Sequence, residues 1–156
     1  MIPSSVPRLR AAILMLCVFL APRSSLSQER RGPRGPMLGF HYGVPLKWSA
    51  ALAIPLPGGS EARNAFVAAE PGIGGWRASI GYLQIQGQLG SGYVTRASVL
   101  RTGNRAWRAP AGATFVGGEF QYMPLFVLGL RVGAFARVSK APERKALFTA
   151  DVSLML

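Results

Sequence analysis

The chain has 156 residues, of which 18 are Lys or Arg, 6 are Asp or Glu, one is His and one is Cys, and its formal net charge is +12. A single cysteine excludes a disulfide framework within the chain, and no His/Cys cluster supports a zinc site. The 19 glycines and 12 prolines divide the sequence into short segments, which disfavours long helices and favours one all-β domain.

Residues 1–27 have the pattern of a secretory signal peptide. Arg8 and Arg10 form a basic start, residues 11–21 form an apolar core, and small residues precede a cleavage site near Ser27. The core is too short to span a bilayer, which takes about 20 apolar residues. We therefore expect export followed by cleavage; an uncleaved anchoring helix is the alternative.

Eight segments of alternating apolar and polar residues follow a basic lead-in at 28–37. They span residues 38–46, 48–56, 64–70, 76–86, 92–101, 113–123, 126–138 and 146–156. Most have the length of a membrane strand, about 9–11 residues, and Gly/Pro turn residues separate them, as at 71–75 and Pro124. The alternation slips near 83–85, where we predict a β-bulge. We predict that 38–156 form an all-β, eight-stranded antiparallel up-and-down transmembrane barrel.

The last segment shows the alternation most clearly. Phe148, Ala150, Val152, Leu154 and Leu156 fall on one face, and Thr149, Asp151, Ser153 and Met155 fall on the other. Successive side chains of a strand point to opposite faces, so this segment is an amphipathic strand. We predict that it closes the barrel by pairing with the first segment.

Each segment has an apolar face and a polar face. A soluble barrel turns the apolar face inward, whereas a membrane barrel turns it toward lipid, and alternation alone does not distinguish the two. Aromatic residues near the segment ends suit membrane interfaces, and glycines on the polar face leave room for long side chains inside a narrow barrel. The aromatic residues are Tyr42, Trp48, Trp76, Tyr82, Tyr122 and Phe148, and the glycines are Gly39, Gly43, Gly81, Gly117, Gly129 and Gly133. Both features favour the membrane barrel.

The polar face carries charges in the middle of the strands. They are the carboxylates Glu70, Glu119 and Asp151 and the arginines Arg77, Arg96, Arg131 and Arg137. A buried charge needs a partner, so we predict an ion-pair network in the lumen between neighbouring strands. The expected pairs are Glu70 with Arg77, Glu119 with Arg96 and Arg131, and Asp151 with Arg131 or Arg137. Such a network is either a structural plug or part of a gated, ion-conducting lumen.

Little in the sequence points to catalysis. His41 is the only histidine, and Ser79, Ser98 and Ser153 lie on different strands without a nucleophile motif. No helical pattern follows the Gly-rich residues 71–75, which favours a tight turn between strands over a phosphate-binding loop. We expect no catalytic site, no cofactor and no metal.

The longer connections are basic. They carry Arg105, Arg108, Lys140, Arg144 and Lys145. These side chains could bind phosphates of outer-membrane lipids, such as those of lipopolysaccharide, or form an ordinary solvated surface. Export removes the protein from nucleic acid, so we expect no nucleic-acid partner.

With these features the chain resembles the small eight-stranded outer-membrane barrels of the OmpA/OmpX type. The resemblance covers residues 38–156 and is carried by the leader, the eight segments, the charged inner face and the last strand. Barrels of that type commonly end in an aromatic residue, whereas this sequence ends in Leu156. They serve as anchors, adhesins or enzymes, so the resemblance implies architecture and not a specific activity.

Our leading hypothesis is a monomeric integral protein of the bacterial outer membrane with a structural or surface-interaction role. The alternative is a soluble exported barrel, periplasmic or secreted, that binds an apolar ligand in its interior.

Overall fold

The computed structural model describes residues 35–60, 62–86, 90–125, 127–139 and 145–155. The expected signal peptide, most of the lead-in, Lys140, Arg144 and Leu156 lie outside these residues. Within the described ranges, no helix is long and apolar enough to cross a membrane.

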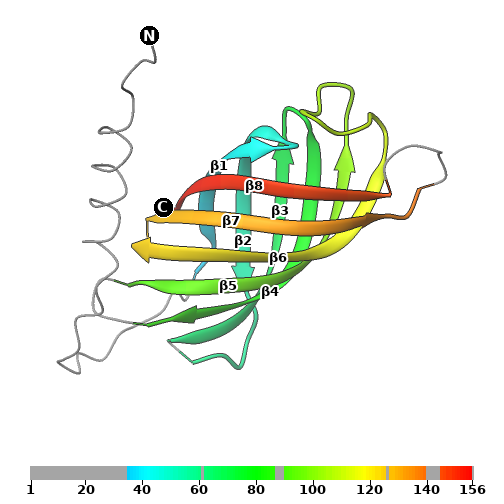
Figure 1. Ribbon diagram of the computed structural model, residues 1–156. Helices are drawn as coiled ribbons and strands as arrows, with labels where there is room; N and C mark the ends of the chain where they lie inside the picture. Colours follow the sequence, from blue (N-terminus) through cyan, green and yellow to red (C-terminus); the bar gives the residue numbers. More distant parts are fainter. Residues whose placement is uncertain (1–34, 61, 87–89, 126, 140–144, 156) are drawn as a thin grey trace, which may run out of the picture.

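Eight antiparallel strands form one closed barrel in which each strand pairs with its neighbours in sequence (Figure 1). They are β1 (Met37–Val44), β2 (Lys47–Pro55), β3 (Arg63–Gly72), β4 (Gly75–Ile85), β5 (Gly92–Thr102), β6 (Thr114–Leu125), β7 (Leu128–Arg137) and β8 (Ala146–Met155). β8 closes the barrel by pairing with β1, from Gly39↔Met155 to Val44↔Ala150. The predicted all-β, eight-stranded antiparallel barrel is confirmed.

Some predicted strand ends were wrong, because proline was taken as a strand breaker. β3 continues through Pro71 and Gly72, which leaves only Ile73 and Gly74 as the turn to β4. The β2–β3 pairing is interrupted beside Pro71, which has no N–H to donate to a ladder. β6 likewise continues through Pro124.

The β-bulge predicted near 83–85 was also wrong. β4 pairs with β5 in continuous register from Gly75↔Thr102 to Ile85↔Gly92. The register shift lies instead between Tyr122 and Leu125 of β6, where β6 pairs with β7. Leu83 keeps the inward orientation of the polar face but packs in an apolar cluster at one end of the lumen. The strand therefore keeps its regular backbone here, and the alternation is broken only because an apolar residue, Leu83, takes an inward position.

The apolar faces of the strands point outward. Large apolar side chains are exposed on all eight strands, among them Phe40, Trp48, Val67, Ile80, Val99, Phe120, Val132 and Phe148. Burial alternates residue by residue along β8, with Leu147, Thr149, Asp151 and Ser153 inward. The barrel thus carries its apolar side chains outside and its mid-strand charges inside, the reverse of the arrangement in a soluble barrel.

The interior is filled in three layers. An apolar cluster lies near the end where β8 terminates and contains Met37, Ala53, Phe66, Leu83, Val94 and Met123. A second apolar cluster lies near the opposite end and contains Leu46, Leu100, Ala113, Phe115, Phe135 and Leu147. Between the two lie the buried charged side chains, including Arg77 and Arg131, at 2% and 1% exposure. Eight strands enclose an interior just wide enough for side chains to fill, so the charges are sealed at both ends.

The two ends of the barrel differ in their connections. We call the end bearing the connections 45–46, 73–74, 103–113 and 138–145 the loop rim, and the other end the terminal rim. Residues 103–113 and 138–145 are the two longest connections between strands. The β5–β6 connection rises at the upper right of Figure 1, away from the carboxyl end of the chain.

Inward-facing glycines on β7 make room for the polar layer. A Cβ atom on Gly129 would lie 2.4 Å from Ser153 Oγ and 2.5 Å from Gln121 Nε2, and one on Gly133 would lie 2.7 Å from Thr149 Oγ1. Gly118, on the outward face of β6, has only a backbone oxygen at 3.9 Å.

We predict that Gly129→Val lowers the free energy of unfolding by about 1–3 kcal/mol, because the added methyls displace Gln121 and Ser153 in a packed interior. Gly118→Val makes the same change on the outer wall and should cost less than about 0.5 kcal/mol. Urea unfolding in detergent micelles measures both. Equal effects of the two substitutions would contradict the inward placement of Gly129.

Candidate functional site

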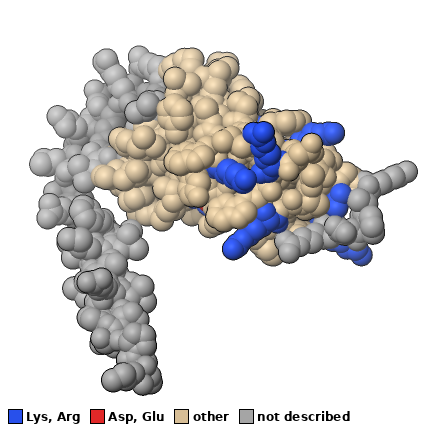
Figure 2. All heavy atoms as spheres, turned by 90° about the horizontal axis from the view of Figure 1, so that it is seen from above, with Lys and Arg blue, Asp and Glu red and all other residues tan. Residues whose placement is uncertain are grey.

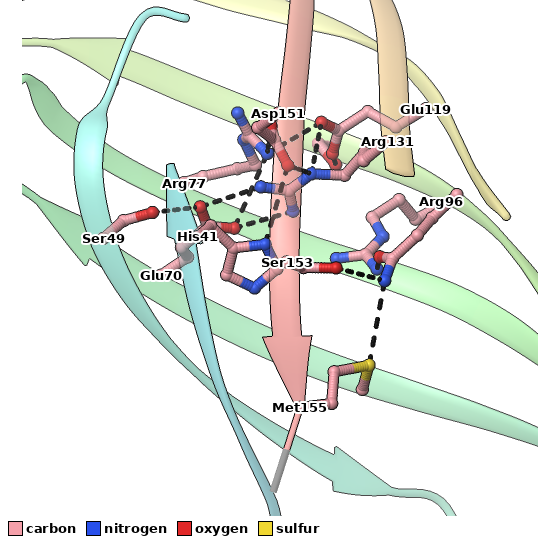
Figure 3. Close-up of polar contacts among 12 residues, drawn as sticks. His41, Ser49, Glu70, Arg77, Arg96, Glu119, Arg131, Asp151, Ser153 and Met155 are labelled. Atoms are coloured by element: carbon pink, nitrogen blue, oxygen red, sulfur yellow. Dashed lines mark hydrogen bonds and ion pairs between the residues drawn. The ribbon is translucent and has the colours of Figure 1, made fainter. Parts of the chain in front are cut away.

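Arg131 of β7 links opposite walls of the barrel. Its Nη1 and Nη2 donate to Glu70 Oε2 and Oε1 of β3 at 2.8 and 2.9 Å, a bidentate contact. Its Nε donates to Asp151 Oδ1 of the neighbouring β8 at 2.7 Å. Because β3 and β7 lie four strands apart in an eight-stranded barrel, the Glu70–Arg131 pair crosses the lumen (Figure 3). The planar guanidinium suits such two-sided pairing, since it presents donors on several edges.

Arg77 of β4 makes a second set of ion pairs. Its Nη1 lies 2.9 Å from Glu119 Oε1 of β6 and 3.5 Å from both Glu70 Oε2 and Asp151 Oδ2. Its contact with Asp151 also spans opposite strands, β4 and β8. The two arginines therefore share the same three carboxylates and tie five strands into one network.

Hydroxyl groups complete the carboxylate coordination. Ser49 Oγ donates to Glu70 Oε1 at 2.6 Å, and Ser98 Oγ donates to Glu119 Oε2 at 2.5 Å. Each of the three carboxylates is at most 8% exposed. A buried charge is tolerated when its partner and its remaining hydrogen bonds are supplied. Both oxygens of Glu70 accept hydrogen bonds. Glu119 Oε1 and Arg77 Nη1 have no hydrogen-bond partner among the described residues and are held by their ion pair.

Arg96 is placed differently from the prediction. Although Arg96 and Glu119 are opposite each other on β5 and β6, Glu119 is occupied by Arg77 and Ser98. Arg96 Nη2 donates instead to Gln121 Oε1 at 2.5 Å, and its guanidinium lies 5.5 Å from the centre of the Phe66 ring. The expected Arg96–Glu119 ion pair is thus replaced by an amide and a cation–π contact.

Two further residues singled out in the sequence lie at the edge of the ion-pair network. Arg137 lies at the loop-rim end of β7, six positions beyond Arg131, where its Nε donates to Ser139 Oγ at 3.0 Å. His41 is buried on β1, with Nδ1 3.6 Å from Asp151 Oδ1. The histidine therefore borders the ion-pair network and is shielded from solvent.

The middle layer balances its charges. Among the described residues, the buried Arg77 and Arg131 and the half-buried Arg96 face Glu70, Glu119 and Asp151, three positive against three negative groups. A cavity of about 20 Å³ near the terminal rim is bordered by His41, Arg96 and Gln121, room for about one water. The lumen is therefore a packed, neutral layer.

A larger hollow of about 860 Å³ opens on the outer wall over β4 to β8. Its centre is the cross-strand row Ala97↔Gly118↔Ala134, bordered by larger side chains such as Phe120 and Phe148. This hollow lies on the outward apolar face, and its lining also includes Arg96 and Glu119.

Basic side chains gather at the loop rim. Arg105, Arg108 and Lys145 are exposed there, together with Arg101 at the end of β5. Figure 2 shows basic side chains clustered on one half of the molecule, with no acidic side chain visible on that face. Lys140 and Arg144, the other two predicted basic residues, lie outside the described residues.

Sequence reasoning missed the contacts that cross the lumen. Alternation assigns residues to a face, but the tilt and stagger that bring β3 opposite β7 are properties of the closed barrel. Gln121 and Ser49 were also missed, since neutral polar side chains carry no charge to balance. The six central charged residues were predicted because their charges share one face of the alternating segments, opposite the apolar face.

No group of three or more His, Cys, Asp or Glu side chains in the described part of the chain could hold a metal ion. No family model matches the chain, and searches of curated proteins and of solved structures found no similar protein. What the structure shares with small outer-membrane barrels is thus limited to eight antiparallel strands in one closed barrel.

We predict that Glu119→Ala lowers the free energy of unfolding by about 3–5 kcal/mol, because it leaves Arg77 without its closest carboxylate. Glu119→Gln keeps the volume and an acceptor for Ser98, so the difference between the two variants separates lost charge from lost packing. Urea unfolding in detergent provides the measurement. An unchanged midpoint in both variants would show that the network adds no stability.

Proposed function

We propose that this chain is an integral β-barrel of the bacterial outer membrane, with a structural or surface-interaction role and no catalysis. The observation that carries the proposal is the inverted polarity: large apolar side chains cover the outside, while five charged side chains in mid-barrel, those of Glu70, Arg77, Glu119, Arg131 and Asp151, are buried inside. In water, an outer wall of this kind would expose far more apolar surface than a soluble monomer tolerates.

The dimensions support a membrane location. Strands of 8 to 12 residues at about 3.3 Å per residue are about 26–40 Å long. With a tilt of about 40° they span about 20–30 Å, close to the apolar band of outer-membrane barrels, about 25 Å. Aromatic side chains lie near both ends, with Trp48 and Trp76 at the loop rim and Tyr82 and Tyr122 toward the terminal rim.

The interior favours a structural role over transport or ligand binding. The packed ion pairs and the two apolar layers occupy the lumen, so the structural plug is favoured over the gated, conducting lumen. A soluble barrel that holds an apolar ligand would need an apolar cavity inside, whereas the described interior is polar at its centre and the cavity beside His41, Arg96 and Gln121 has a volume of about 20 Å³. His41, the one histidine, is buried where a substrate in solution would not reach it.

The proposal predicts that the folded protein depends on detergent or lipid and resists dodecyl sulfate until heated. On a denaturing gel, the unboiled sample should migrate faster than the boiled sample, because the closed barrel stays compact. In a density gradient, the protein should float with phosphatidylcholine vesicles. A protein that is soluble and monomeric without detergent and shows no mobility shift would overturn the proposal in favour of the soluble barrel.

A further inference from the structure

Aromatic side chains form a cluster at one sector of the loop rim. The Tyr42 and Trp48 rings, which pair across β1 and β2, have centroids 4.6 Å apart, and Trp107 of the β5–β6 connection lies 6.4 Å from Tyr42. All three aromatic rings are exposed. Tryptophan and tyrosine prefer the boundary between the hydrocarbon and the head groups, so this sector is suited to lie at that depth.

Backbone hydrogen bonds hold the β5–β6 connection against its neighbours. Trp107 N donates to Pro45 O of the β1–β2 turn at 2.9 Å, and Gly103 N donates to Gly74 O of the β3–β4 turn at 2.7 Å. These bonds place the segment 105–108 beside the turn that precedes Lys47. Two basic segments distant in sequence are thus fixed in one sector.

The backbone at two of these basic residues is unusual. Lys47 has φ of 61° and Arg108 has φ of 57°, and they are the described non-glycine residues with positive φ. This left-handed region is unfavourable for a residue with a Cβ atom, and such residues concentrate at functional positions. The Arg108 guanidinium lies 5.4 Å from the centre of the Trp107 ring, which keeps the cation beside the aromatic cluster.

No carboxylate is exposed among the described residues. The three described acidic residues, Glu70, Glu119 and Asp151, are all buried in the lumen and neutralised there. The exposed side chains of Arg101, Arg105 and Lys145 at the loop rim are basic and give this rim a positive field next to the apolar wall. A field of this sign at the membrane boundary attracts phosphate groups.

We propose that the sector formed by Lys47, Trp48, Arg105, Trp107 and Arg108 binds the phosphate head group of an anionic lipid in the leaflet next to the loop rim. The acyl chains would pack on the apolar wall below Trp48, while the cations contact the phosphate from the connection and the turn. This inference rests on the proposed membrane location and deepens it by naming the lipid class and the site. A phosphate ion in solution would make only the contacts with the cations and none with the apolar wall.

The three tryptophans of the chain are Trp48, Trp76 and Trp107, and all three lie at the loop rim, so their fluorescence reports on this rim alone. We would insert the full-length protein into phosphatidylcholine vesicles and compare quenching by brominated phosphatidic acid and by brominated phosphatidylcholine. The native protein should prefer phosphatidic acid by about five-fold or more, and the preference should fall with added salt.

The variant Lys47→Gln/Arg105→Gln/Arg108→Gln should lose this preference and retain quenching by phosphatidylcholine. Arg63→Gln, which removes an exposed cation from the terminal rim, is the matched control and should keep the preference. The gel-mobility shift shows that each variant is folded, and Arg105→Gln alone, in an exposed connection, should give an intermediate preference.

Equal quenching by the two lipids, or a preference that survives in the triple variant, would overturn the inference and leave the membrane location intact. A complete lack of quenching by phosphatidylcholine would overturn the membrane location as well. A fluorescence change with inorganic phosphate that sodium chloride of equal ionic strength does not produce would assign the site to free phosphate instead of lipid.

Discussion

The ion pair between Glu70 and Arg131 crosses the lumen from β3 to β7, and the rest of the barrel depends on the network around it. Once apolar side chains face outward, charged groups inside have no solvent, and each must find a partner within an eight-stranded interior. Arg131 and Arg77 meet this demand by sharing Glu70, Glu119 and Asp151. Apolar layers at both ends then keep water from competing with these pairs.

The sequence was sufficient to predict which residues lie inside, but not which of them meet. Period-2 alternation identified eight strands and the inward position of Glu70, Arg77 and Arg131, because a one-residue shift would expose every charge to the outer medium. The contact between Glu70 and Arg131 follows from closure and stagger, which no local pattern encodes. The same limit explains Arg96, whose nearest carboxylate by register is already occupied by Arg77 and Ser98.

The charges in the lumen and the exposed cations of the loop rim differ in their surroundings. Charges in the lumen are balanced and enclosed, which leaves the exposed cations of the loop rim as the surface with a chemical preference. Trp48 and Trp107 place that surface beside the apolar wall, where lipid head groups would lie if the barrel spans a membrane. The interior ion pairs and the lipid binding that we propose at the loop rim therefore use separate residues. Substitutions at one should leave the other unchanged.

The most direct test of this account is a double-mutant cycle on the unfolding free energy with Arg131→Met, Glu70→Met and the double variant, measured by urea unfolding in detergent. Each single substitution strands a buried charge and should cost about 3–5 kcal/mol. The double variant removes both charges of the bidentate pair, so its cost should fall below the sum of the two by about 2 kcal/mol or more. Additive costs, within about 0.5 kcal/mol, would show that the two side chains do not meet across the lumen and would contradict the account.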